Sequence, residues 1–276
     1  MNASKTNQVD STYFKSAVEF RQRASLILEG SLHLAASVKS YPLAKTLIET
    51  QVMFKVGVLS ISHPQTIEWF RSTMASTYGG PEGIPALEFR SKTIRTPDEN
   101  EIATEDLCAL ELDIERKHAD NFTRQKIELC AKQGIPPQIA LSAYREIWWI
   151  LIRAKNMDPT VPAEKLDVKP NQDGVGITFF DKKNLKQYEN EAEENRLVHM
   201  FPFVVPNVAQ KAGKLTVRFM APKKAGRYKF FVDVKSGEFL GCDHDFTLVA
   251  DVVDRNTVQR VEKVPSDKVE PTTESG

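Results

Sequence analysis

The sequence is poor in cysteine, carries no net charge and contains no long apolar run. Its three cysteines among 276 residues form no C-x-x-C pair, which argues against a disulfide framework and favours a reducing compartment. Thirty-seven basic residues balance 37 acidic ones, so overall charge does not favour nucleic acid, although a local basic patch would still allow it. The longest wholly apolar run, at 147–152, is far shorter than the roughly 20 residues of a membrane span.

The first residues, MNASKTNQVDS, are polar and lack the apolar segment of a signal peptide. The chain is 41% hydrophobic and 27% charged, a composition typical of soluble globular proteins that bury a sizeable core. It also lacks the phosphate-loop, zinc-protease and serine-hydrolase motifs. We therefore expect a soluble cytoplasmic protein that is not an enzyme and holds no cofactor or metal.

Apolar residues recur at helical spacing in the first part of the chain. The pair Tyr41-Pro42 predicts a break between a first and a second helix, because the residue before proline avoids the α region. Pro64 is suited to the first turn of a third helix. Short connections and broad apolar faces predict a helical bundle over 11–85, after a disordered stretch at 1–10.

The segment 86–157 is predicted to contain short helices and a connecting helix. Thr104, followed by two acidic residues, is typical of a helix N-cap. Leu107, Leu110 and Ile114 would form the buried face of that helix.

Two further helices are predicted in the same segment. One runs from Thr123 to a stop at Gly134. The other, at 139–153, follows a double proline that favours a helix start. The same apolar run also fits a buried strand, because periodicity does not separate the two in short runs.

After Asp158 the hydrophobic period changes to two, as in strands. Pro202 and Pro206 predict an edge strand or a bulge, because proline cannot donate to a sheet ladder. The segment 158–254 therefore predicts an antiparallel β-sandwich of immunoglobulin or fibronectin type III kind, followed by a disordered tail at 255–276. The whole chain is predicted to be α+β. The strand-like runs are GVGITFF, LVHMFPFVV, KLTVRFM, RYKFFVDV and DFTLVADVV.

One short stretch, SGEFLGCDHDF at 236–246, concentrates residues of the kind that bind metals. Cys242, Asp243, His244 and Asp245 are consecutive, so in an extended chain their side chains alternate between opposite faces. A zinc site needs three or four convergent ligands. We therefore interpret the stretch as a turn between two strands, and a metalloenzyme centred on 242–245 is the weaker alternative.

The same stretch resembles the end of a Sec sixty-three unit, also called a Brl domain. In that family, a proline-glycine hairpin precedes an alternating aromatic strand and a Ser-x-x-aromatic-x-Gly-x-Asp turn. The matching residues are Pro222, Gly226, Tyr228, Val232, Ser236, Phe239, Gly241 and Asp243. The apolar segment at 27–60 similarly resembles the opening helices of the unit. Gly237 and His244 depart from the pattern, which has Asp and Gln at these places.

The resemblance implies a protein-interaction scaffold at the cytosolic face of the endoplasmic reticulum, with translocon subunits as partners and no membrane span in this chain. Trp148, Trp149, Phe239 and Asp243 are the candidate partner-binding residues, and Gly226, Ser236, Gly237 and Gly241 are the candidate turn residues. Family members also act as accessory units of Ski-like RNA helicases and spliceosomal complexes, which is the alternative function. The sequence has no J-domain loop, no helicase motif and no long acidic tail.

Overall fold

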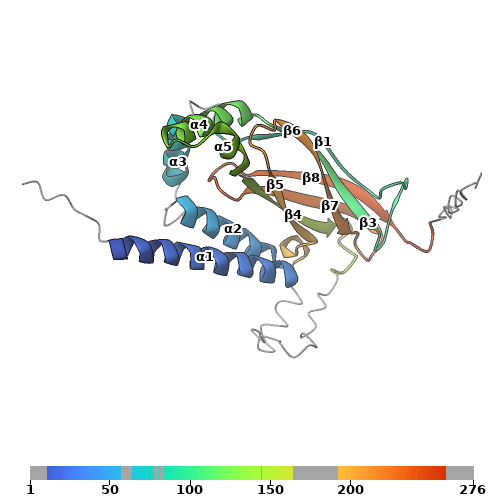
Figure 1. Ribbon diagram of the computed structural model, residues 1–276. Helices are drawn as coiled ribbons and strands as arrows, with labels where there is room; N and C mark the ends of the chain where they lie inside the picture. Colours follow the sequence, from blue (N-terminus) through green and yellow to red (C-terminus); the bar gives the residue numbers. More distant parts are fainter. Residues whose placement is uncertain are drawn as a thin grey trace, which may run out of the picture.

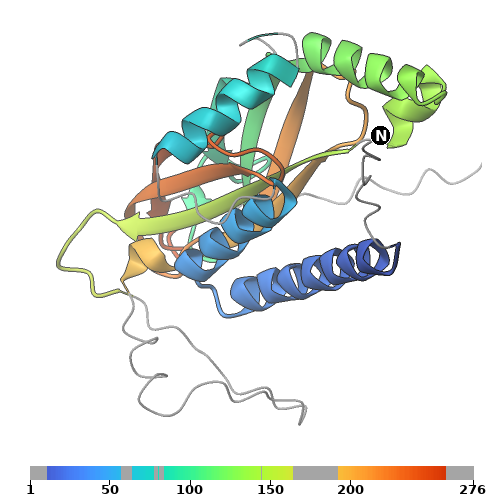
Figure 2. The same ribbon diagram turned by 90° about the vertical axis from the view of Figure 1, so that its left-hand side faces the viewer.

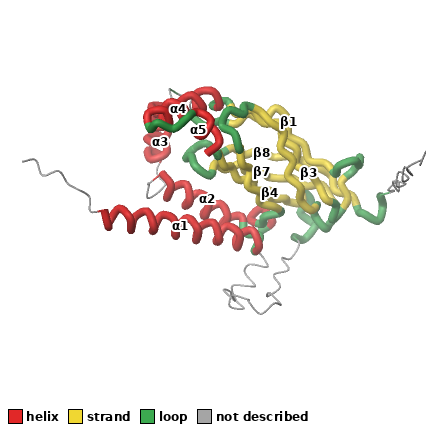
Figure 3. Tube along the Cα trace, in the orientation of Figure 1, coloured by secondary structure: helices red, strands yellow, loops and turns green. Residues whose placement is uncertain are grey.

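The computed structural model describes residues 11–56, 64–77, 80, 84–143, 145–163 and 192–258 (Figures 1 and 3). Helices make up 34% of it and strands 37%, which confirms the α+β class. The predicted disordered stretch at 1–10, the GVGITFF run and the tail from residue 259 lie outside the described residues.

Three helices form where the first part of the sequence predicts them. They are α1 (Ser11–Ser37), α2 (Tyr41–Val56) and α3 (Pro64–Thr77). The pre-proline residue Tyr41 begins α2, and Pro64 occupies the first turn of α3, as expected from the fixed φ of proline.

These helices do not pack around a core of their own, in contrast to the predicted bundle. The helices α1 and α2 lie side by side, and α2 lies against a sheet (Figures 1 and 2). Ala44 and Ile48 of α2 share a small buried cluster with Leu151 of a strand. Phe70 and Met74 of α3 belong instead to the main core. Helical periodicity reveals which face is buried but does not reveal what covers it.

The strands form two curled sheets that resemble a half-barrel. The smaller sheet has the order β1-β3-β6, and the larger has the order β2-β8-β7-β4-β5. All neighbours are antiparallel except β2 and β8. Side chains from both sheets share one buried core, which includes Leu110, Val217, Ile150, Phe230 and Val232. The strands are β1 (Leu87–Arg95), β2 (Ile102–Ala103), β3 (Leu107–Arg116), β4 (Glu146–Asn156), β5 (His199–Val205), β6 (Ala212–Met220), β7 (Gly226–Ser236) and β8 (His244–Val253).

The predicted helix after Thr104 is wrong, because this segment is the central strand β3 of the smaller sheet. The residues chosen as a helical face, Leu107, Leu110 and Ile114, do fit a spacing of three and four. However, Cys108, Leu110, Leu112 and Ile114 alternate along the strand and are all buried. The presumed N-cap is a turn in which the carboxylate of Asp106 accepts a hydrogen bond from the Ala103 amide, at 2.9 Å.

The predicted helix at 139–153 is also wrong over most of its length. The double proline does start a helix, α5 (Pro137–Ala143), but the tryptophan pair lies in β4. This strand is covered on both faces, by the core on one side and by α2 on the other. Its apolar residues are therefore continuous and show no alternation. The predicted sandwich begins at residue 158. However, β4, a central strand of the larger sheet, precedes that residue in the sequence.

The predicted helix at 123–134 is confirmed as α4 (Ala119–Lys132). Gly134 follows it with φ of 72°, the left-handed conformation that stops helices. The strand with Pro202, β5, forms an edge of the larger sheet, as proline requires. Among the described helices, none combines the length and the apolar content needed to cross a membrane.

Candidate functional site

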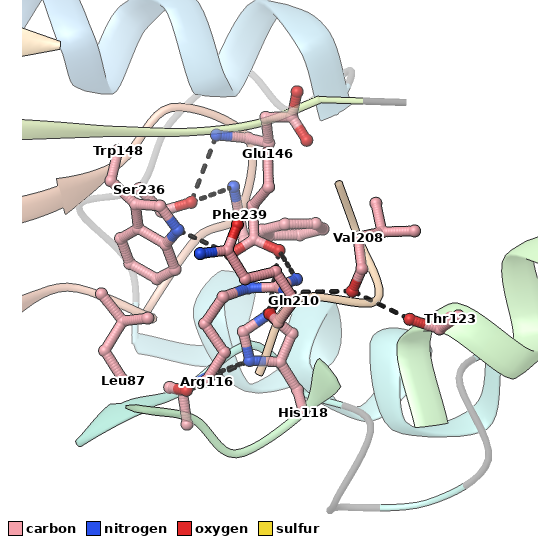
Figure 4. A network of polar contacts seen from close by, with 12 residues as sticks. Leu87, Arg116, His118, Thr123, Glu146, Trp148, Val208, Gln210, Ser236 and Phe239 are labelled. Atoms are coloured by element: carbon pink, nitrogen blue, oxygen red, sulfur yellow. Dashed lines mark hydrogen bonds and ion pairs between the residues drawn. The ribbon is translucent and has the colours of Figure 1, made fainter. Parts of the chain in front are cut away.

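The most polar part of the interior lies where β3 ends and β4 begins (Figure 4). Arg116 is the last residue of β3, His118 follows it, and Glu146 is the first residue of β4. Their side chains are 3%, 0% and 0% exposed. Three ionisable side chains in the core require a reason, because burial of an unpaired charge is strongly unfavourable.

The carboxylate of Glu146 accepts hydrogen bonds from all the polar side chains around it. Arg116 donates from Nη2 at 2.5 Å and from Nε at 3.3 Å. The Nε2 atom of His118 lies 3.0 Å away, and Nε1 of Trp148 donates at 2.6 Å. Burial alone would raise the pKa of Glu146, but the hydrogen bonds and charges of His118 and Arg116 lower it to about 2.

The same network connects parts of the chain that are far apart in sequence. Nη1 of Arg116 donates to the carbonyl of Val208 at 2.9 Å and to that of Gln210 at 2.5 Å. The hydroxyl of Thr123 in α4 donates to the Val208 carbonyl, and Nδ1 of His118 lies 3.0 Å from the amide nitrogen and 3.1 Å from the carbonyl oxygen of Ala86. The carboxylate thus joins the two sheets to α4 and to the loop after β5. All these partners are internal, so the arrangement is suited to holding the fold together.

The stretch 236–246 forms the connection from β7 to β8, as predicted. The hydroxyl of Ser236 accepts hydrogen bonds from the amides of Glu238 and Phe239, at 3.2 and 2.9 Å. Asp243 accepts from the Ser236 amide at 3.0 Å and from Lys235 at 2.7 Å. These bonds close the turn from both ends, which explains why serine and aspartate stand at these two places.

The helices α2 and α4 are attached to this β7–β8 turn. Lys55 of α2 donates to the carbonyl of Gly237 at 2.9 Å, and Glu49 of α2 accepts from Lys235 at 2.9 Å. Burial disfavours the charged form of Lys235, but Asp243 and Glu49 raise its pKa above the ordinary value. In addition, Phe239 packs edge-on against Phe122 of α4, with ring centroids 5.9 Å apart.

The turn glycines act in two different ways. Gly241 has a φ of 70°, and an added Cβ would lie 2.7 Å from a methyl of Ile67 in α3. Gly226 has a φ of 152°, and a Cβ there would lie 2.6 Å from the side-chain nitrogen Nδ2 of Asn156. By contrast, Gly237 has no positive φ, so this turn position does not need the backbone freedom of glycine. It is constrained by space, because a Cβ would lie 3.1 Å from the Ile147 carbonyl.

The four consecutive ligand-type residues do not converge. Cys242 is buried, and its Sγ contacts the Leu240 carbonyl at 3.6 Å. Asp243 is engaged with Lys235 and Ser236, while His244 accepts from the Leu87 amide of β1 at 3.2 Å. Within the described part of the chain, no group of three His, Cys, Asp or Glu residues could hold a metal ion.

The candidate partner-binding residues lie mostly inside the protein. Trp148 is 0% exposed and Phe239 is 6% exposed, so a partner could reach neither without opening the fold. Trp149 is half-buried against the cluster between α2 and the larger sheet. Asp243 has a side chain that is 40% exposed, but both its oxygens hold the turn together.

A small cleft is lined by parts of β5 and β6, which are edge strands of the two sheets among the described residues, and sequence reasoning missed it. The edge strand β5 contributes Phe203, Val204 and Val205, and the edge strand β6 contributes residues through Leu215. The opposite side of the half-barrel is closed, because β1 and β8 contact each other through Phe89 and Phe246. The sequence contains no signal for the cleft, since it depends on which edges remain unpaired.

No family model matches the chain, and no curated protein matches it either. The family resemblance therefore rests on the residues quoted for it, most of which form the β7–β8 turn and the strand before it.

Proposed function

We propose that this protein is a non-catalytic protein-interaction scaffold, similar to the Brl unit of the Sec sixty-three translocation subunit. It would act at the cytosolic face of the endoplasmic reticulum and support protein translocation through translocon subunits. The β7–β8 turn is the observation that carries the proposal. The resemblance residues Ser236, Phe239, Gly241 and Asp243 each have a structural task there: Ser236 and Asp243 close the turn, Phe239 packs against α4, and Gly241 allows the close approach of α3.

The order of the strands supports the finer fold assignment. If β1, β3, β4, β5, β6, β7 and β8 are lettered A, B, C, C′, E, F and G, the two sheets have the orders A-B-E and C′-C-F-G. Immunoglobulin-like sandwiches divide their strands between sheets in this way. We infer that the curled sheets are a sandwich of this kind, in which α4 and α5 lie between strands B and C.

We assign partner docking to the cleft between β5 and β6. Unpaired strand edges offer backbone donors and acceptors, and an extended segment of a partner can add to such an edge. The apolar side chains Phe203, Val204 and Leu215 would contact alternate side chains of that segment. Arg116 of the buried Glu146 network lines this cleft. The only role of the network in docking would be to hold the wall of the cleft in position.

The test is co-purification from cells with mass spectrometry, using a matched pair of variants. Val204 is 39% exposed in the cleft, whereas Val249 is 50% exposed on β8, outside it. We expect the wild-type chain and Val249→Asp to recover translocon subunits, and Val204→Asp to lose them.

One result would contradict the scaffold proposal, and another would contradict only the assignment of docking to the cleft. One is recovery of RNA-processing factors without translocon subunits, together with RNA binding that falls steeply with salt, which would indicate the helicase alternative. The other is equal recovery of translocon subunits by both variants, which would remove the cleft from the proposal.

A further inference from the structure

A histidine joins the two sheets on the closed side of the half-barrel. His244 is the first residue of β8 in the larger sheet, and Leu87 is the first residue of β1 in the smaller sheet. The Leu87 amide donates a hydrogen bond to Nε2 of His244 at 3.2 Å, so a side chain links these two strands. Leu87 is 5% exposed, and a buried amide that loses its acceptor is strongly unfavourable.

This hydrogen bond requires the neutral form of the imidazole. Nε2 accepts from an N–H only when it carries no proton itself, and the single proton of the neutral ring is then on Nδ1. A second proton would occupy Nε2 and face the Leu87 N–H across the same 3.2 Å, one donor against another. Protonation of His244 therefore removes the link to β1 and puts a repulsion in its place.

The surroundings of His244 disfavour its charged form. The ring packs edge-on against Phe89 of β1, with centroids 5.7 Å apart, and its centroid lies 6.2 Å from that of Trp148 in β4. Burial lowers the pKa of His244 below the ordinary value of 6.5, although the charges of Asp243 and Asp245 act in the opposite direction.

The other groups around the ring do not offset this effect. The partner of His244 in register on β7 is the apolar Val234. From β1, the ammonium group of Lys92 lies over the rings of Phe89 and Phe246, at 5.8 and 4.8 Å, and so adds positive charge to the same aromatic cluster. Within the described part of the chain, no hydrogen bond joins His244 to a carboxylate.

The residue before Leu87 provides a contrast. Ala86 is held by His118, whose Nδ1 lies 3.0 Å from the amide nitrogen and 3.1 Å from the carbonyl oxygen of Ala86. Nε2 of His118 lies 3.0 Å from the carboxylate of Glu146. A proton on either nitrogen of His118 therefore finds an acceptor, whereas a proton on Nε2 of His244 meets a donor.

We propose that His244 is a pH-sensitive latch between the two sheets. The neutral ring holds Leu87 and keeps β1 against β8, and the protonated ring releases it, so that the contact between Phe89 and Phe246 loosens in acid. Because the folded pKa is lowered, the latch is fully closed above pH 6.5 and is lost as the pH falls through the folded value. The cleft between β5 and β6 lies on the other side of the half-barrel, so the latch and the scaffold function can fail independently.

Amide hydrogen exchange followed by NMR tests the latch in the full chain. The measured quantity is the protection factor of the Leu87 amide, which is corrected for the intrinsic effect of pH on exchange. In the wild type we expect it to fall about tenfold or more from about pH 7.5 to about pH 4, because a buried donor loses its acceptor. The Ala86 amide should keep its protection over the same range.

The decisive variant is His244→Gln. Its side-chain oxygen accepts a hydrogen bond at every pH, so the Leu87 protection factor should change less than about twofold over the same range. The matched control is His199→Gln on β5. Burial also lowers the pKa of His199, but this residue lies outside the contact between β1 and β8, so the variant should retain the wild-type response. Equal loss of protection in His244→Gln and in the wild type would overturn the proposal.

A further measurement uses the wild-type chain alone. The nitrogen resonance of Nε2 in His244 shifts when this atom gains a proton, and the midpoint of that titration should coincide with the midpoint for the loss of Leu87 protection. Separate midpoints, or a Leu87 protection factor that does not change while His244 titrates, would refute the latch. Equal losses at Ala86 and Leu87 would indicate a general loosening in acid and would also count against it.

Discussion

Replacement of Glu146 by alanine should destabilise the protein more than any exposed ion-pair substitution. The variant would leave the Arg116 guanidinium buried, 3% exposed, next to the Val208 and Gln210 carbonyls and Nε2 of His118 but without a carboxylate. Removal of one partner from a buried ion pair typically costs about 3–5 kcal/mol, because the remaining charge is uncompensated. Trp148 and His118 would also each lose a hydrogen-bond acceptor.

The lowered pKa of Glu146 corresponds to a similar contribution to the free energy of unfolding. Its value of about 2 in the folded protein, against 4.5 ordinarily, corresponds to about 3 kcal/mol of stability from ionisation. Because the folded pKa is lowered, this contribution is complete above pH 4.5 and is lost as the pH falls towards 2. The stability difference between wild type and Glu146→Gln should therefore shrink across this pH range.

Urea denaturation followed by circular dichroism is the assay for both effects. The matched control is Glu115→Ala, which removes an ion pair with Arg90 and Lys117 at the surface and should cost less than about 1 kcal/mol. A loss below about 1 kcal/mol for Glu146→Ala would refute the reasoning. It would mean that water or a rearranged acceptor replaces the carboxylate.

Three further predictions concern packing and reactivity. Phe230→Ala should cost about 3–5 kcal/mol in urea denaturation, because Phe230 is 0% exposed. Its neighbour Phe231 is half-buried, so Phe231→Ala should cost less. Equal losses would overturn the assignment of the strand faces. Gly241→Ala should lower stability by about 1–3 kcal/mol, because alanine is strained at the positive φ of this position. Gly30→Ala should raise stability by about 0.5–1 kcal/mol, because a Cβ there would lie in open space on a helix. A higher melting temperature for Gly241→Ala than for Gly30→Ala would contradict this. A thiol reagent should modify Cys130 first in the folded protein, because burial raises the pKa of the other two cysteines to about 11 and about 12; three equally fast thiols would count against the buried placement.

Features that depend on neighbouring residues could be predicted from the sequence. The helix starts at Tyr41 and Pro64, the helix stop at Gly134 and the edge strand with Pro202 all follow from backbone constraints of single residues. The alternation in β7 and β8 was equally informative, because each of these strands has one face on the core and one face largely outside it.

Where a strand is covered on both faces, the same reasoning failed. This is the case for β4, whose apolar residues are nearly continuous, so their period does not separate the strand from a helix. In β3 the apolar residues do alternate, but Leu107, Leu110 and Ile114 also fit helical spacing, so the pattern allowed both structures. The carboxylate network could not be predicted either. Arg116 and Glu146 are thirty positions apart in the sequence, and nothing near either residue indicates that they meet.

By itself, the sequence determined the first three helices, the helix stop at Gly134 and the turn SGEFLGCDHDF, because short-range sterics and side chain to backbone hydrogen bonds decide such features. Only the tertiary structure decided that Trp148 is interior, that Glu146 pairs with Arg116 and His118, and that β5 and β6 are edge strands of the two described sheets. These facts depend on which surfaces exclude water from one another, and that is a property of the assembled chain.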